Sequence, residues 1–83
     1  MSKASKEQSR AAEELLELRA QIQETRSRIV RANNYFNFVR DPVLVEACVL
    51  EMKALEKRYE YLLRTYREIA APHLMQSNVL GVS

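Results

Sequence analysis

The chain has 83 residues, of which 47% are hydrophobic and 29% charged, with a formal net charge of +2. This composition excludes wholesale disorder, and one glycine with two prolines is too few for the turns of a multi-strand protein. The interleaved charges give no extended basic footprint for nucleic acid. We therefore expect one small all-α domain.

Cellular location is predicted from what the sequence lacks. The N-terminal stretch MSKASKEQSR has no apolar segment of a secretory signal, and no apolar run approaches the roughly 20 residues that cross a bilayer. The only cysteine, Cys48, cannot form an internal disulfide, and it lies in an apolar run typical of a core position. We expect a cytoplasmic protein that does not contact a membrane.

The first predicted element is a helix over about residues 6–39. Apolar or small residues recur at alternating spacings of four and three, which is the pattern of a heptad seam. A helix of this length is not stable alone in water, so it must pack on another element. The residues of this first seam are Ala11, Leu15, Leu18, Ile22, Thr25, Ile29, Ala32, Phe36 and Val39.

The dipeptide Asp41-Pro42 interrupts the helical pattern. Proline disfavours helical dihedral angles at the residue before it and donates no amide hydrogen bond to the preceding turn. The same proline suits the first position of a new helix, whose free amides the Asp41 carboxylate can cap. We predict a bend at Arg40-Asp41 between two antiparallel helices.

The second predicted helix covers about residues 42–70. In an antiparallel hairpin, residues whose numbers sum to about 84 lie opposite one another, which places Ile29 against Leu55. The hairpin then comprises residues 1–71, and Pro72 ends the second helix and begins a loosely ordered C-terminal tail, residues 72–83. The second seam consists of Val45, Cys48, Met52, Leu55, Tyr59, Leu62, Tyr66 and Ile69.

The segment NFVRDPVLVEACVLEMKALEKRYEYLLR carries a family resemblance. Its aromatic-Val-x-Asp-Pro bend and its Arg58-Tyr59-x-Tyr61-Leu62-Leu63 ending resemble the YaaL-like family of small uncharacterised bacterial proteins. The resemblance extends from about Glu13 to Glu68. It implies a small, soluble, cytoplasmic helical protein with no catalytic activity.

Side chains that support catalysis or metal binding are sparse. The only histidine, His73, is separated from Cys48 by the length of the second helix, and no glycine-rich loop is present to hold phosphates. Glutamates recur on the second helix at positions 46, 51, 56 and 60, but without the neighbouring histidine typical of bundles that bind two metals. We predict no enzyme activity, no metal and no cofactor.

The second helix carries a second apolar stripe besides its seam. A single hairpin buries one face of each helix, so this stripe would stay exposed on a protein with a small core. We expect it to bind a second copy about a two-fold axis near Leu50 to Ala54, forming an antiparallel four-helix bundle, or else to bind another protein. The stripe consists of Val43, Ala47, Leu50, Ala54 and Tyr61.

Arginines and aromatic residues near the bend form an alternative contact surface. Arginine binds phosphate and aromatic rings stack on bases, although contact with a protein partner is the interpretation we favour. We therefore predict a non-catalytic interaction or adaptor protein that docks helical surfaces on a protein partner. The alternative is a nucleic-acid-binding accessory protein. The surface near the bend consists of Arg28, Arg31, Tyr35, Phe38 and Arg40.

Overall fold

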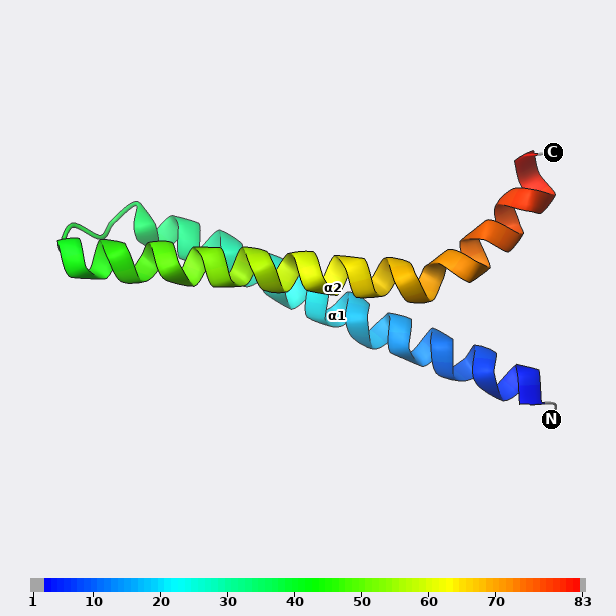
Figure 1. Ribbon diagram of the computed structural model, residues 1–83. Coiled ribbons are helices and arrows are strands. Elements are labelled where there is room, and N and C mark those ends of the chain that lie inside the picture. The colour runs from blue at the N-terminus through cyan, green and yellow to red at the C-terminus, as the bar shows by residue number, and fades with distance from the viewer. Residues whose placement is uncertain (1–2, 83) are drawn as a thin grey trace.

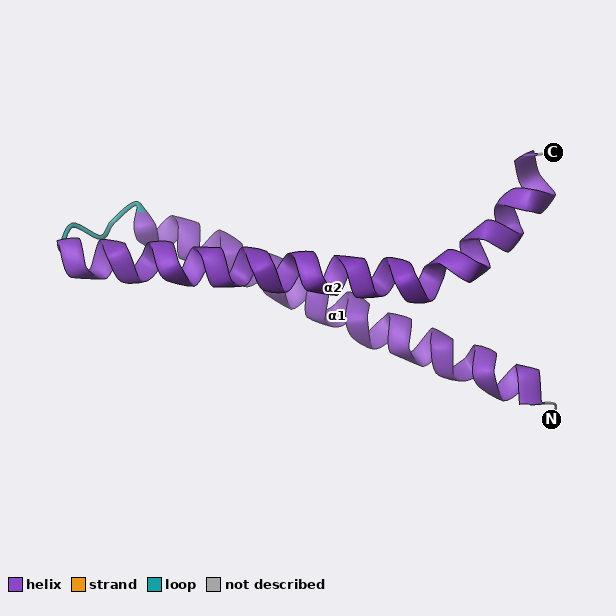
Figure 2. Ribbon diagram, viewed as in Figure 1, coloured by secondary structure: helices purple, strands orange, loops and turns teal. Residues whose placement is uncertain are grey.

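The protein is a helical hairpin (Figures 1 and 2). The computed structural model describes the backbone of residues 3–82 and the side chains of residues 6–72. Helix α1 covers Lys3–Phe36, helix α2 covers Pro42–Val82, and residues 37–41 join them. The described backbone contains no strand, and the two helices pack on each other in an antiparallel arrangement. The predicted all-α hairpin is confirmed.

The hairpin is elongated. Its extents are 59 × 31 × 15 Å, and its radius of gyration is 18.4 Å, compared with about 12 Å for a compact domain of this length. The helices lie together next to the loop and diverge toward the two termini (Figure 1). The core is therefore a line of contact between two rods and not a closed interior.

The seam of α1 matches the heptad pattern residue by residue. Within residues 6–40, the nine predicted seam residues are the only ones that are buried or half-buried. Ile22 and Thr25 are the most buried of these, and the Thr25 hydroxyl donates a hydrogen bond to the carbonyl oxygen of Gln21, at 2.8 Å. That bond satisfies the only polar side chain that the seam buries.

The seam of α2 is confirmed as well. All eight predicted residues are buried or half-buried, and Cys48, Leu55 and Leu62 are the most deeply buried of them. One groove brings Thr25 beside Arg58, and another brings Ala32 beside Glu51. Both neighbouring pairs agree with an antiparallel register in which opposed residue numbers sum to about 84.

The start of α2 is built as the sequence predicts. The backbone N–H of Val43 donates to the Asp41 carboxylate, at 2.9 Å, and the N–H of Val45 donates to the Asp41 carbonyl oxygen, also at 2.9 Å. Asp41 is thus the N-cap and Pro42 the first helical residue, where its missing N–H removes no bond.

The end of α1 differs from the prediction. The helix ends at Phe36 and not at residue 39, so the bend comprises residues 37–41 and not Arg40-Asp41 alone. The N–H of Phe38 donates to the Tyr35 carbonyl oxygen, at 3.0 Å, which tightens the last turn. A chain that reverses between two packed helix axes needs several non-helical residues, and Pro42 keeps Asp41, the residue directly before it, out of helical geometry.

The predicted end of α2 at residue 70 is wrong, because the helix continues through Pro72 to Val82. A proline inside a helix removes one backbone hydrogen bond and bends the axis, but the helix can resume after it. Figure 1 shows the change of direction at the start of the orange segment of α2. The backbone of the predicted tail, residues 72–83, is therefore helical as far as Val82, and its side chains after Pro72 lie outside the described residues.

The seam supplies the stability of the hairpin, so its deeply buried residues should be sensitive to truncation. Leu55 is only 5% exposed, and Leu55→Ala should cost about 2–5 kcal/mol, measured by urea unfolding followed by circular dichroism. Leu16, which is 67% exposed on α1, provides the control, and Leu16→Ala should cost less than about 0.5 kcal/mol. Equal losses at the two positions would contradict the seam.

The Asp41 cap gives a second prediction. Asp41→Ala removes the acceptor of the Val43 amide and should lower the free energy of unfolding by about 0.5–2 kcal/mol. Asp41→Asn keeps a side-chain oxygen at the same position and should retain most of that stability. The same urea titration measures both variants, and an alanine variant as stable as the unmutated chain would show that the cap is unimportant.

Candidate functional site

The outer face of α2 presents the apolar stripe predicted from the sequence. All five of its residues are exposed, and the large ones, Val43, Leu50 and Tyr61, keep 74%, 61% and 56% of their surface in water. The seam of α2 begins at Val45, and the stripe occupies helical positions on the opposite side. The expectation that one hairpin leaves this face uncovered is met.

The stripe is not apolar along its whole length. Lys57 stands between Ala54 and Tyr61, and its ammonium lies 3.5 Å from the carboxylate of Glu60. Both side chains are exposed, so this pair contributes little to stability. The pair places one positive and one negative charge beside the apolar residues.

The surface near the bend is only partly assembled. Arg28, Arg31 and Tyr35 line one shallow groove together with Ala32 and with Glu51 from α2. Phe38 and Arg40 lie beyond the end of α1, where both are exposed, and they do not line that groove. Phe38 keeps 82% of its surface in water.

Acidic side chains weaken the positive character of this groove. The Glu51 carboxylate belongs to its lining, and the guanidinium of Arg31 lies 3.8 Å from the carboxylate of Glu24. Both partners of that pair are exposed, so solvent and salt screen it. The groove therefore mixes charges and is not a basic patch.

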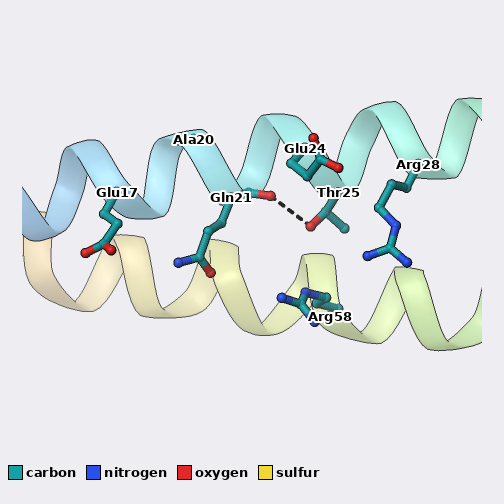
Figure 3. A pocket seen from close by; sticks show the side chains of 7 residues that line it. All are labelled: Glu17, Ala20, Gln21, Glu24, Thr25, Arg28 and Arg58. Atoms are coloured by element: carbon teal, nitrogen blue, oxygen red, sulfur yellow. Dashed lines mark hydrogen bonds between the residues drawn. The ribbon is translucent and has the colours of Figure 1, made fainter.

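A neighbouring groove contains Arg58, which was not among the candidate contact residues predicted from the sequence. Figure 3 shows Arg58 on α2, at a level between Gln21 and Arg28 of α1, and all three residues line this groove. Glu17, Ala20, Glu24 and Thr25 complete its lining. Glu51 and Arg58 each come directly before a seam residue of α2, and residues next to a seam lie at the edge of the contact between two packed helices. The seam pattern of the sequence therefore contained the signal that both residues border α1.

The groups with potential reactivity are engaged in packing. The Cys48 thiol is buried in the seam, and the Thr25 hydroxyl is bonded within α1. Within the described side chains, no group of three or more histidine, cysteine or acidic residues is arranged to hold a metal ion. His73 lies outside the described side chains.

Within the described residues, neither helix combines the length and the apolar character that crossing a bilayer requires.

A family model described as a protein of unknown function (DUF2508) matches residues 1–70. No curated protein and no solved structure matches the chain. The matched range includes α1, the loop and α2 as far as Ala70, so both seams and both candidate surfaces lie within it.

Removing metal ions should leave the fold unchanged, because the seams hold the hairpin together. We expect the same melting temperature, measured by circular dichroism, with and without EDTA. A fall of several degrees that added zinc reverses would show instead that a metal site contributes to stability.

Proposed function

The chain belongs to the DUF2508 family of proteins of unknown function, and we propose that it is a non-catalytic helical adaptor that docks the outer face of α2 on a protein partner. The observation that carries this proposal is the exposure of Val43, Leu50 and Tyr61 on one face of α2. Apolar side chains aligned along a helix face bind a complementary helix or groove, because burial removes their surface from water.

The total surface supports an interaction role. The chain exposes 7020 Å², compared with about 5,100 Å² for a compact folded protein of 9.7 kDa. A standard protein–protein interface takes about 800 Å² from each partner. The difference between the exposed area of this chain and that of a compact protein is large enough for one such interface. Because the hairpin is elongated, this additional area lies along its length.

Two narrower assignments belong to the same proposal. The Asp41-Pro42 bend and the segment that follows it support placing the chain with the YaaL-like proteins, which is compatible with its family membership. A cytoplasmic location is proposed from the composition of the chain and its free cysteine, Cys48.

Nucleic-acid binding is the second candidate function. Arg28, Arg31 and Tyr35 line one groove, which favours this function. The arginines could contact a phosphate there while the tyrosine ring stacks on a neighbouring base. It is disfavoured by Glu51 in the same groove and by Glu24 beside Arg31. We therefore rank it below protein docking.

Capture from native cell extract tests the adaptor role. A tagged chain should retain a defined set of proteins, identified by mass spectrometry, and Leu50→Glu should release that set because it places a charge in the stripe. Leu16→Glu makes the same change at a similarly exposed leucine on α1 and should retain it. Circular dichroism verifies that both variants stay helical, and equal retention by the two would contradict the proposal.

Salt dependence separates the two functions. Binding through phosphate contacts should weaken steeply with salt: log K should fall by roughly 0.7–0.9 for each phosphate contacted when the salt concentration rises tenfold. Docking of an apolar stripe should depend little on salt. Fluorescence anisotropy with single-stranded RNA at several salt concentrations measures this slope. Tight RNA binding that Arg28→Ala and Arg31→Ala abolish, while Leu50→Glu leaves it intact, would favour the second function.

A further inference from the structure

Charged side chains on both sides of the stripe restrict which helix can pack on it. We propose that the occupant is a second copy of the chain, whose α2 packs antiparallel on the first about a two-fold axis between Leu55 and Glu56. This rests on the proposed function, since it uses the same stripe, but it adds the partner and the register. The axis follows from the rows of side chains on either side of the stripe.

Each flank of the stripe is a row of residues spaced by seven along α2. All are exposed except Thr65, which is half-buried, so they are free to face a second helix. One row lies on the side away from α1 and the other borders the grooves described above. The first row is Glu46, Lys53, Glu60 and Arg67, and the second is Leu44, Glu51, Arg58 and Thr65.

When two identical helices pack antiparallel, each flanking row faces the same row of the partner. An axis between Leu55 and Glu56 sets Lys53 opposite Glu60 and Glu46 opposite Arg67 in the first row. It sets Glu51 opposite Arg58 in the second. The two-fold axis repeats each contact, so every charged residue in the two flanking rows meets the opposite charge.

Two other arrangements of the same stripe bring like charges together. An axis near Leu50 to Ala54, the one expected from the apolar residues alone, sets Glu51 against its own copy and Lys53 against its own copy. A parallel pair brings Glu46 near Glu51 and Lys53 near Arg58, because in that case the two different rows face each other. Like-charge contacts of this kind reject a register or a partner.

Side-chain size also fits the proposed axis. Leu50 packs on Tyr61 of the other chain, and the small residues Ala47 and Ala54 face Arg64 and Lys57. The aliphatic stems of these long side chains can cover an alanine while their charged ends stay in water. At the edge of the contact Val43 faces Glu68, so the apolar contact is concentrated around Leu50 and Tyr61.

The shape of α2 agrees with this placement. The straight part of the helix begins at Pro42 and continues to the bend shown in Figure 1, with Pro72 inside the helix. An axis between Leu55 and Glu56 lies at the middle of that straight part, and residue 42 of one chain is then level with residue 69 of the other. Beyond this bend the rest of α2 turns away from α1 (Figure 1), so the straight contact ends there.

Charge exchange across the first row tests this register. Sedimentation of the full chain at micromolar concentration should show a dimer, which Lys53→Glu and Glu60→Lys each weaken by about tenfold. Combining the two substitutions should restore the original affinity to within about threefold. Glu13→Lys makes the same charge change on an exposed position of α1 and should have no effect.

The alternatives give different results in that experiment. With the axis near Leu50 to Ala54, Lys53→Glu exchanges one like-charge contact for another, while Glu60→Lys strengthens the dimer. In a parallel dimer Lys53→Glu strengthens association. Either result overturns the proposed axis.

Disulfide trapping reports the register directly, in a Cys48→Ser background. A mixture of Ala54→Cys chains with Lys57→Cys chains should form a mixed disulfide, because these residues share a layer about the proposed axis. A mixture of Ala54→Cys with Leu50→Cys chains should not. The reverse pattern overturns the axis.

A monomer at about 100 μM in the unmutated chain overturns the second-copy proposal. If Leu50→Glu still releases other captured proteins, the adaptor role survives that failure. A dimer that Leu50→Glu leaves intact overturns the use of the stripe itself.

Discussion

Two helices joined as a hairpin touch along one line, and every other feature of this protein depends on that constraint. Each helix can bury a single stripe of its surface, so the seam residues of α1 are the only shielded ones between residues 6 and 40. The core contains few deeply buried apolar side chains, among them Cys48, Leu55 and Leu62. A fold of this kind has little stability to spare, and whatever lies opposite the seam remains in water.

The Asp41-Pro42 junction sets where α2 begins, and burial of the apolar seam sets which face of α2 is turned toward that line. Asp41 caps the helix, Pro42 is its first residue, and the shielded residues Val45 and Cys48 face α1. The same rotation turns Leu50 outward and places Glu51 and Arg58 at the border between the two surfaces. The packing of the seam therefore decides which residues of α2 are available to a partner.

The proposed adaptor role and the proposed second copy both follow from the exposed apolar stripe of α2 and not from a reactive group. The apolar part of that face is short, with Lys57 interrupting it, so apolar burial alone would select a partner poorly. The flanking charges add selectivity, because they match the axis between Leu55 and Glu56 and oppose both the axis near Leu50 to Ala54 and a parallel pair. In this interpretation the apolar residues provide the affinity and the charged rows provide the orientation.

The sequence by itself determined the helices, the two seams and the cap, because a helical period and a proline act on neighbouring residues. It also identified the outer stripe, since the face of a helix opposite the seam of a two-helix protein has nothing to pack on. The tertiary structure decided where α1 ends, because the loop must span the distance between packed axes. It also showed that Arg28, Arg31 and Tyr35 share a groove with Glu51, while Phe38 and Arg40 lie apart from it. That grouping depends on how side chains from two helices meet, and local periodicity does not contain that information. The continuation of α2 beyond Pro72 also needed the structure, because a proline signal alone does not distinguish a helix that ends from one that bends.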